Sequence, residues 1–523
     1  MSECLIRLSY GNYPIGVQSF EKIRKDNYVY IDKTRYVYRL AKTGSYYFLS
    51  RPRPFGKSLL ISTFQAYFAG KKELFEGLDI EQLEKDWTTY PVLHLDLNAR
   101  NYEDENSLLE ELNKHLEIWE REYGSHYGDR APEERFFHVI RLAYEKTGQR
   151  VVILVDEYDK PMLQAIEDDR LQQVYRNQLK PFYGVMKSMD SYIKFAFLTG
   201  VTKLGKISVF SDLNNLNDIS MNPDFAAICG MTEKEIHHYF DLDIHTLATK
   251  EDLTYDETVE LLRDNYDGYH FTENSEGIYN PFSLLNTFYA MRPDNYWFAT
   301  GTPSFLVYLL QRSRYDLWEL EEVETDSDVL DSIDSFSKNP IPVIYQSGYL
   351  TIKGYDKRFK LYTLGFPNLE VKEGFFKYLL PYYADVKETD TTFNIRKFVG
   401  EVETGDYDSF FSRLQTFFSN IPYDLVGDLE KHYQNVLYII SCLMGFYVDA
   451  EYHTNRGRAD LILKTPAYIY IMEFKLNGTL EEAIRQIEEK GYAEPFAHDP
   501  RKLVKLAVNF SSKTRNIEGW KVV

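Results

Sequence analysis

YYFLSRPRPFGKSLLIST, residues 46–63, is the stretch around which this 523-residue chain is organised. The apolar run at its start predicts a buried strand, and the leucines and phenylalanines that follow have helical spacing. The turn between them ends in Gly56-Lys57-Ser58. This layout is typical of a phosphate-binding loop, where backbone amides and a helix N-terminus face phosphates, the lysine neutralises charge and the serine binds Mg²⁺. The alternative is a degenerate turn that is retained for folding.

One position differs from the usual loop pattern, and another removes a backbone donor. Arg51 stands where the pattern has glycine. Pro54 removes a backbone N–H that is expected to face the β–γ region of a bound nucleotide. Because the lysine and the serine are both present, the sequence predicts nucleotide binding more directly than it predicts hydrolysis.

A second motif, VVILVDEYD at residues 151–159, joins a strand-like run to carboxylates. Five apolar residues without alternation predict a strand that is buried on both faces, as in a parallel sheet. The run ends in Asp156-Glu157. In phosphate-loop enzymes an acidic residue at this place helps to hold Mg²⁺, and a neighbouring glutamate can polarise the attacking water. Side chains at the carboxyl ends of such strands also lie where open α/β sheets bind ligands.

Two further strands complete the predicted sheet. Val92–Leu97 lies in sequence between the loop strand and the acidic strand, and Ile193–Thr199 is another buried run. Thr199 either senses the γ-phosphate or caps the next helix. The four strands with intervening helices predict a doubly wound parallel sheet, in the order that fits the phosphate-loop ATPases with a catalytic glutamate.

The charge distribution separates the ends of the chain from its middle. The net charge of −20 argues against a general nucleic-acid coat. Residues 20–72 nevertheless carry 12 Lys/Arg against 3 Asp/Glu, and residues 431–523 carry 13 against 11. A polyanion partner therefore stays open. Three scattered cysteines without a CxxC pair predict a reduced, cytoplasmic protein, and the longest uncharged apolar run, Val436–Val448, is too short to span a membrane.

The rest of the chain reads mainly as helices with a few short strands. Residues 71–90 are predicted to be helical, and residues 104–147 to form two amphipathic helices. The predicted domains are an ATPase-like domain at 1–230, a helical lid at 231–300, a winged-helix-like part with linking helices at 301–430, and a C-terminal domain at 431–523.

The C-terminal domain carries a different chemistry. Gly457–Leu463 and Tyr468–Lys475 are predicted to form a hairpin. Glu473 and Lys475 are two residues apart, so they share one face of their strand, and Asp460 can reach that face from the partner strand. Two carboxylates and an ammonium suit Mg²⁺ and metal-assisted phosphodiester hydrolysis. The alternative is an ion-pair cluster on a hairpin edge.

From about residue 13 to 520 the chain resembles bacterial proteins that join an AAA-ATPase-like domain to a C-terminal PD-(D/E)xK nuclease-superfamily domain, which has a restriction-endonuclease-like α/β fold. The matching stretches, in one order, are Leu49–Ser58, Val151–Met162, Phe197–Val201, Gln346–Thr351, Gly457–Leu463, Ile471–Lys475 and Gln486–Tyr492. Arg51 is usual in that family, whereas Pro54 replaces an arginine and Ala459 replaces the nominal proline of the nuclease motif.

The resemblance implies roles for the motif residues. Lys57 and Ser58 would bind phosphate and Mg²⁺, and Asp156 and Glu157 would serve the metal and the water. Glu451 and Gln486 are weaker candidates for the nuclease centre. The predicted catalytic residues are Glu157, Asp460, Glu473 and Lys475. The predicted nucleotide-binding residues are Arg53, Phe55, Gly56, Lys57, Ser58, Asp156 and Thr199, and the predicted metal ligands are Ser58, Asp156, Asp460 and Glu473.

These predictions favour an ATP-dependent or ATP-gated, Mg²⁺-dependent nuclease of the bacterial cytoplasm that acts on DNA more readily than on RNA. One alternative is a nucleotide-dependent switch or scaffold whose nuclease fold only binds a partner. Another is an ATPase without a polynucleotide substrate, which the acidic middle of the chain would suit. The oligomeric state is open.

Overall fold

The computed structural model describes residues 12–124, 128–204, 209–210, 213, 215–300, 304–331, 339–384, 386–419, 429–445, 447, 449–454 and 459–523. They form two compact units. The first comprises Met1–Ser313 with Glu322–Val371, and the second comprises Arg314–Glu321 with Lys372–Val523. Helices of the described part are all too short or too polar to cross a membrane.

The first unit is built on a five-stranded sheet in which all pairs are parallel. The strands are β1 (Tyr46–Ser50), β2 (Val92–Asp96), β3 (Val151–Asp156), β4 (Ile193–Gly200) and the short β5 (Asn217–Asp218), in the order β2-β3-β4-β1-β5. Strands β1 and β3 are buried along their whole length, as their unbroken apolar runs predict. The prediction of a parallel α/β sheet is therefore confirmed.

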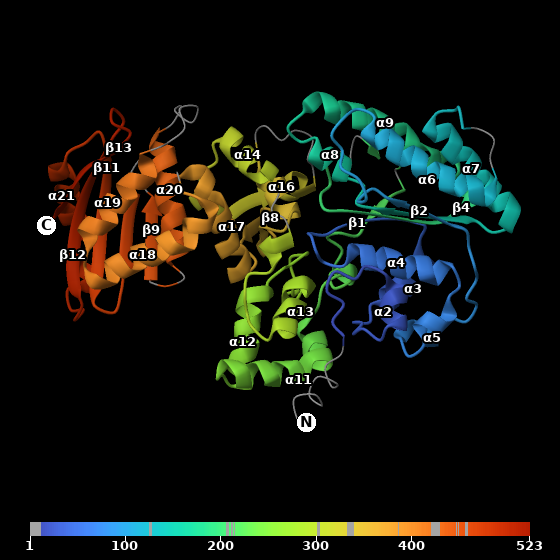
Figure 1. The fold of residues 1–523 in the computed structure, drawn as a ribbon, viewed down its shortest axis with the longest axis horizontal. Coiled ribbons are helices and arrows are strands. Elements are labelled where there is room, and N and C mark those ends of the chain that lie inside the picture. The colour runs from blue at the N-terminus through green and yellow to red at the C-terminus, as the bar shows by residue number, and fades with distance from the viewer. Residues whose placement is uncertain are drawn as a thin grey trace. The chain divides into compact units, whose positions relative to one another are not determined.

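Helices cover both faces of this sheet (Figure 1). One group comprises α2 (Phe20–Lys25), α3 (Thr34–Thr43), α4 (Lys57–Phe68) and α5 (Asp79–Leu83), and the other comprises α6 (Ser107–Tyr123), α7 (Pro132–Thr147), α8 (Lys160–Gln164) and α9 (Asp169–Ser188). The two helices expected within residues 104–147 are confirmed. The helix expected over residues 71–90 is wrong in part, because only a 3₁₀ turn and α5 form there before an extended segment leads into β2.

A helical group follows the sheet in sequence. It comprises α11 (Glu233–Glu251), α12 (Tyr255–Tyr266) and α13 (Pro281–Ala290), which share a core of their own. Thr232 and Thr254 begin α11 and α12 with reciprocal capping boxes, and Asn280 caps α13. The expectation that residues 231–300 are helical is confirmed.

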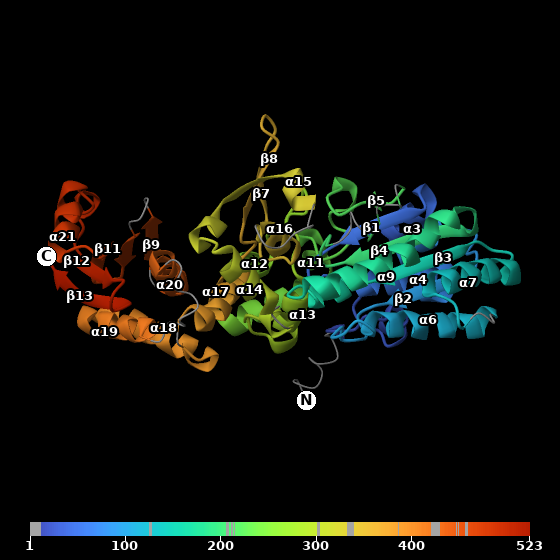
Figure 2. The same ribbon diagram turned by 90° about the horizontal axis from the view of Figure 1, so that it is seen from above.

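The last part of the first unit alternates short helices and strands. Its elements are α14 (Ser304–Ser313), β6 (Val323–Asp326), α15 (Ser327–Asp331), α16 (Ile341–Gln346), β7 (Thr351–Asp356) and β8 (Leu361–Gly365). The three strands form an antiparallel sheet in the order β6-β8-β7. The β7–β8 hairpin projects from these elements (Figure 2).

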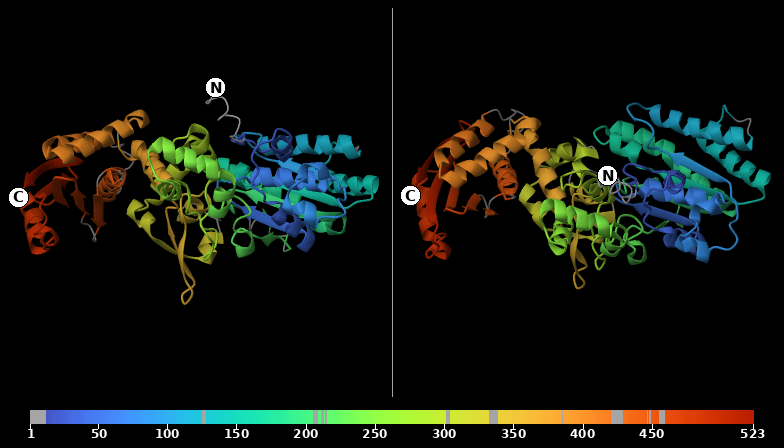
Figure 3. Two further views of the ribbon diagram at one scale, coloured as in Figure 1. Left: turned by 90° about the horizontal axis from the view of Figure 1, so that it is seen from below. Right: turned by 60° about the horizontal axis from the view of Figure 1, so that its bottom comes forward.

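The second unit contains a mixed five-stranded sheet with helices around it (Figure 3). Its helices are α17 (Leu369–Tyr383), which starts at the unit boundary, α18 (Thr391–Thr404), α19 (Tyr407–Phe418), α20 (Leu429–Met444) and α21 (Leu480–Glu489). Its strands are β9 (Asp449–Thr454), β10 (Ala459–Lys464), β11 (Tyr468–Leu476), β12 (Lys502–Ser511) and β13 (Asn516–Val522), in the order β13-β12-β11-β10-β9. The hairpin predicted for residues 457–475 is formed by β10 and β11.

Helices α18 and α19 pack on this sheet, although the sequence suggested linking helices. The amide of Gln415 donates to the carbonyl oxygen of Ile517 at 2.8 Å, and the indole of Trp520 stacks on Phe411. Both helices thus belong to the same compact unit as the C-terminal sheet.

Candidate functional site

The turn after β1 is shaped as a phosphate-binding loop requires. Gly56 has φ = 94° in the left-handed region, which only glycine adopts without strain, and α4 begins at the next residue. The ammonium of Lys57 is buried under the loop and donates to the carbonyl oxygen of Arg51 at 2.9 Å. The first turn of a helix leaves N–H groups without intrahelical partners, so this N-terminus suits an anion.

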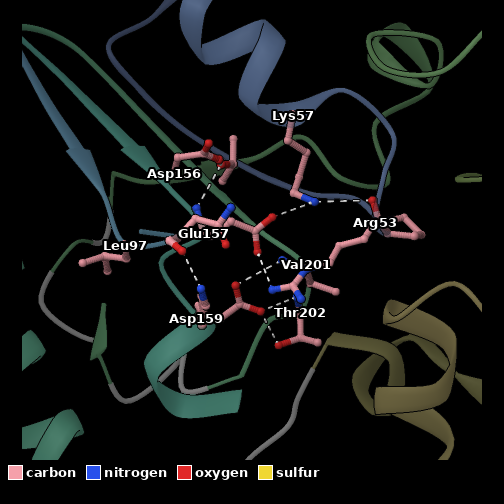
Figure 4. Close-up of polar contacts among 12 residues, drawn as sticks. Arg53, Lys57, Leu97, Asp156, Glu157, Asp159, Val201 and Thr202 are labelled. Carbon is pink, nitrogen blue, oxygen red and sulfur yellow. Dashed lines mark hydrogen bonds and ion pairs between the residues drawn. The ribbon is translucent and has the colours of Figure 1, made fainter. Parts of the chain in front are cut away.

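Glu157 lies at the centre of a cluster of charges (Figure 4). Its carboxylate is 3.1 Å from the ammonium of Lys57 and 3.3 Å from the guanidinium of Arg53. Burial raises the pKa of Glu157, but the two cations outweigh burial and hold the pKa below its ordinary value. Its φ of 55° is strained for a residue with a side chain, as is common at functional sites. The structure thus brings together three predicted residues from two motifs.

Asp156 lies beside this cluster at the end of β3. Its carboxylate accepts a hydrogen bond from the hydroxyl of Thr199 at 2.7 Å. Burial and the charge of Glu157 raise the pKa of Asp156, while hydrogen bonds from Ser58 and Thr199 lower it. Ser58 and Asp156 are therefore close enough to share a cation, and oxygen ligands of this kind suit Mg²⁺.

Asp159 is a buried carboxylate that the sequence reasoning missed. It accepts hydrogen bonds from the backbone N–H groups of Val201 and Thr202, at 3.1 and 2.6 Å, and from the Thr202 hydroxyl at 2.7 Å. Burial, with the nearby charge of Glu157, raises the pKa of Asp159 to about 6. Asp159 therefore fixes the segment that directly follows β4, next to Thr199 at the end of that strand. The signal was present in VDEYD, where a third acidic residue follows the first two.

Arg51 has a structural role that explains why glycine is absent. Its side chain is 1% exposed, and it donates to the carbonyl oxygens of Ser220 at 2.7 Å and Phe225 at 3.2 Å. Its guanidinium also lies 3.9 Å from the centre of the Phe271 ring. Burial lowers the pKa of Arg51 to about 10. Arg51 therefore ties the end of β1 to later segments of the first unit and points away from the phosphate side of the loop.

A cavity of about 410 Å³ opens over the loop. Its charged lining residues are Lys33, Arg53, Lys57 and Glu157. Its apolar lining residues include Pro14, Ile15, Val17, Val29, Ile31, Ile228, Met231, Pro281, Phe282 and Leu285. A volume of this size with mainly apolar walls and a few polar groups is typical of small-molecule sites. The predicted residues Phe55, Gly56 and Ser58 also line this cavity, as does Pro54.

Several segments of the cavity wall were not predicted as binding residues. They include residues 14–18, 29–31, 228–231, 281–282 and 285, which lie outside the loop in sequence. The helical group is tied to the N-terminal part of the chain by an ion pair between Lys33 and Glu235 at 2.6 Å and by a hydrogen bond from Tyr13 to Asp243 at 2.5 Å. The Asn280-Pro281 turn was visible in the sequence, but its place over the loop was not.

The loop is also held from the side of α17. The indole of Trp297 donates to the carbonyl oxygen of Arg53 at 2.6 Å. Glu370, in the first turn of α17, accepts from the backbone N–H groups of Tyr296 and Trp297 at 2.6 and 2.8 Å. Burial raises the pKa of Glu370 to about 7. A short chain of hydrogen bonds thus runs from the backbone of the loop to the start of α17.

The second site lies on β11 and α21. The carboxylate of Glu473, which is buried, forms an ion pair with the ammonium of Lys475, and that ammonium also donates to the amide oxygen of Gln486. As predicted, Glu473 and Lys475 share one face of the strand while Phe474 packs against Phe510. Gln486, a weaker candidate in the sequence, is thus in direct contact with Lys475.

Asp460 is placed by the backbone alone. Its Cα is paired with that of Glu473 between β10 and β11, and residues directly opposite in an antiparallel pair lie on one face. The side chains of Asp460 and Glu451 lie outside the described residues. Within the part that is described, no group of three His, Cys, Asp or Glu side chains could hold a metal ion.

Comparison with known proteins assigns a domain family to each of these two regions of the chain. Residues 14–210 match the family model described as a predicted AAA-ATPase, and residues 428–520 match that of the PD-(D/E)XK nuclease superfamily. A protein of Azotobacter chroococcum mcd 1, described as an uncharacterized protein in the vnfD 5'region, is 34% identical over 532 residues, which cover 98% of this chain and 99% of that protein. The chain therefore belongs to the family of proteins that join a predicted AAA-ATPase domain to a C-terminal PD-(D/E)XK nuclease-superfamily domain.

Proposed function

We propose that the protein binds ATP and acts as an ATP-dependent or ATP-gated, Mg²⁺-dependent nuclease on DNA. The observation that carries the proposal is the placement of Glu473 and Lys475 on one face of β11, opposite Asp460 in the register. The cavity over the phosphate loop supports the nucleotide part.

In the first unit, each charged side chain has a role that its position suits. Lys57 and Arg53 would hold phosphate oxygens, and Ser58 and Asp156 would hold Mg²⁺, which neutralises charge that develops on the phosphates. Both cations are paired with Glu157 in this structure. When phosphate binds, Lys57 and Arg53 would pair with phosphate oxygens and no longer with Glu157. Glu157 would then be free to polarise the attacking water.

In the second unit, Asp460 and Glu473 would hold a divalent cation, which polarises the scissile phosphate and lowers the pKa of its bound water. Lys475 would orient that water and offset charge in the transition state. Gln486 keeps the ammonium in place by accepting one of its three N–H groups.

The remaining parts of the proposal follow from the sequence and the element order. Residues 304–365 contain a helix, a strand, two helices and two strands in sequence, which is an order that suits a winged-helix-like part. The nucleotide state would reposition this part together with the helical lid. The absence of CxxC pairs and of a long apolar helix in the described residues supports a place in the cytoplasm of a bacterium.

The test is cleavage of plasmid and single-stranded DNA with Mg²⁺ or Mn²⁺, with and without ATP. Wild-type protein should cut, and Asp460→Ala and Lys475→Ala should each abolish cutting. Lys464→Ala is the matched control, since Lys464 lies at the other end of the same hairpin and pairs with Asp449 at 3.1 Å. Equal cleavage by wild type and both variants would show that a contaminant cuts and that the nuclease assignment is wrong.

Nucleotide binding has its own test. Lys57→Ala should weaken ATP binding at least about a hundredfold by calorimetry, because it removes a buried cation from the phosphate end of the cavity. Lys71→Ala removes a lysine that pairs with Glu21 outside the cavity, and it should leave the affinity unchanged.

A nucleotide-dependent switch or scaffold is the second candidate. It is favoured by one observation: the Lys475 ammonium is already satisfied by Glu473 and Gln486, as in a purely structural ion-pair cluster. This candidate predicts ATP binding without metal-dependent cutting of any DNA or RNA substrate.

A further inference from the structure

The β7–β8 hairpin ends in a four-residue tip of sequence Lys357-Arg358-Phe359-Lys360. All four residues are exposed, and the Phe359 side chain is 62% exposed. Directly below the tip, Gly354–Asp356 pair with Leu361–Thr363, and the ring centres of Tyr355 and Tyr362 lie 4.6 Å apart. The tip is thus an exposed aromatic ring among three cations on a paired support.

The tip has a defined shape. The carboxylate of Asp356 accepts hydrogen bonds from the backbone N–H groups of Arg358 at 2.7 Å and Phe359 at 3.1 Å. Lys360 closes the turn with φ = 58°. The guanidinium of Arg358 lies 5.0 Å from the centre of the Phe359 ring. Arg358 and Phe359 are therefore presented together by a turn that costs little further ordering when it binds a ligand.

The charge of the tip contrasts with the rest of the chain. The protein carries a net charge of −20, yet the tip has three cations in four residues. Within the described part of the chain, no carboxylate lies within ion-pair distance of Lys357, Arg358 or Lys360. Cations that are exposed and not paired keep their full attraction for a polyanion.

The neighbouring helix α16 is too buried to be the exposed surface that meets a ligand. Helix α16 is buried along almost its whole length, and Gln346 at its end accepts from the backbone N–H of Lys203 at 2.6 Å. The hairpin instead projects from its own unit, as two views show (Figures 2 and 3). It is the exposed feature of residues 339–365.

We propose that the tip of the β7–β8 hairpin is a nucleic-acid binding element for strands with accessible bases. Lys357, Arg358 and Lys360 contact the phosphate backbone, and Phe359 stacks on an unpaired base. Base–aromatic stacking tolerates any sequence because every base has a π-face, and cations around the ring track the backbone. A blunt duplex offers phosphates but no accessible base face, so it would contact only the three cations of the tip and not Phe359. This inference rests on the proposed action on nucleic acid and adds a contact outside both catalytic centres.

The experiment measures fluorescence anisotropy of full-length protein with labelled oligothymidylate of about 20 nucleotides, with oligouridylate and with a blunt duplex, in EDTA so that cutting is prevented. Replacement of the three cations by glutamine should weaken oligothymidylate binding at least about tenfold and reduce the salt slope by about 2. Phe359→Ala should weaken binding of oligothymidylate about tenfold and binding of the blunt duplex less than twofold.

Matched controls come from other exposed surfaces. Phe393 of α18 is 56% exposed, and the ammonium of Lys397 lies 4.4 Å from its ring centre, so Phe393→Ala repeats the chemical change elsewhere. Glutamine at Arg121, Arg141 and Arg170 removes three exposed charges from other helices of the first unit. Both controls should bind as wild type does, and thermal unfolding checks that every variant is folded.

Each outcome has one meaning. If wild type binds oligothymidylate and both tip variants bind equally well, the hairpin inference is overturned and the proposed function stands. If wild type binds neither DNA nor RNA and also fails to cut, the proposed function falls and the inference with it. The same variants are also tested for binding to vesicles that contain anionic lipid; if they lose only vesicle binding and keep oligothymidylate binding, the tip is a membrane contact and the inference is wrong.

Discussion

At the scale of single residues, the loop shows how a substitution in a motif can serve the fold. Arg51 replaces a glycine, and its guanidinium satisfies backbone carbonyl groups at the end of β1 and in residues 220–225. Charge-assisted hydrogen bonds of this kind contribute about 1.5–3 kcal/mol each, and removal of the guanidinium would leave the buried carbonyl oxygens without their donor. The Arg51 side chain therefore stabilises the fold, while Lys57 lines the cavity on the side of the loop where phosphate is proposed to bind.

Restoring the glycine should consequently destabilise the protein. Arg51→Gly is expected to lower the free energy of unfolding by about 3 kcal/mol or more, because three carbonyl oxygens lose their donor and a cavity opens beside Phe271. Thermal unfolding measures the effect. Arg53→Gly, which removes a half-exposed side chain from the same loop, should shift the unfolding midpoint far less. Equal shifts for the two variants would contradict the structural role of Arg51.

Pro54 is the residue at which the loop differs from the family that it resembles. It lines the cavity beside Phe55 and Gly56, and it lacks the N–H that would face the β–γ region. Pro54→Arg should raise the rate of ATP hydrolysis, since it restores a donor and a charge together. Pro54→Ala restores only the donor, so a steady-state phosphate-release assay on both variants separates the two contributions. Unchanged turnover in both would show that position 54 does not limit hydrolysis.

At the scale of elements, the start of α17 is tied to the loop through Trp297. Glu370 accepts hydrogen bonds from the backbone N–H groups of Tyr296 and Trp297, and it thereby fixes Trp297. The indole of Trp297 in turn donates to the carbonyl oxygen of Arg53. Burial raises the pKa of Glu370 from 4.5 to about 7. The folded state therefore favours the neutral carboxyl group of Glu370. The contribution of this group to the free energy of unfolding is fully present below about pH 4.5, and it is lost as the pH rises through 7.

This sign predicts a pH-dependent difference between wild type and Glu370→Gln, whose side chain stays neutral. Between about pH 4.5 and pH 8, wild type should lose up to about 3 kcal/mol of unfolding free energy relative to the variant. Denaturation in urea at a series of pH values measures the difference. Glu260→Gln, at an exposed position of α12, controls for the loss of a carboxylate. A pH-independent difference would mean that Glu370 is ionised throughout.

At the scale of the whole molecule, the two candidate sites lie in different compact units. The phosphate loop and its cavity belong to the first unit, and Glu473, Lys475 and Gln486 belong to the second. An ATP-gated nuclease requires that the state of the first site changes the activity of the second. The two sites can be inactivated separately, because they share no residue.

Single variants of each site therefore test the gating. Lys475→Ala should abolish cutting and leave ATP hydrolysis within about twofold of wild type, since Lys475 is not part of the nucleotide cavity. Lys57→Ala should lower ATP-stimulated cutting to the level seen without ATP. Cleavage and phosphate release measured on the same samples check both statements. Cutting by Lys57→Ala that still rises with ATP would show that the two units work independently.

The sequence by itself determined four of the five strands of the first sheet, the order of its motifs and the pair on β11, because each of these depends on local pattern, whereas the two-residue strand β5 carries no such pattern. An unbroken apolar run specifies a strand that is buried on both faces, Gly-Lys-Ser specifies a turn into a helix, and a spacing of two places Glu473 and Lys475 on one face. These features need only the residues near them in sequence.

Only the tertiary structure decided the features that depend on contacts between segments far apart in the sequence. It placed residues 14–18 and 281–285 over the loop, turned Arg51 toward Phe271, and joined Asp159 to the segment after β4. It also packed α18 and α19 on the C-terminal sheet. No local pattern records which distant segment will cover an apolar face or accept a buried hydrogen bond, because those partners are selected by the packing of the whole unit.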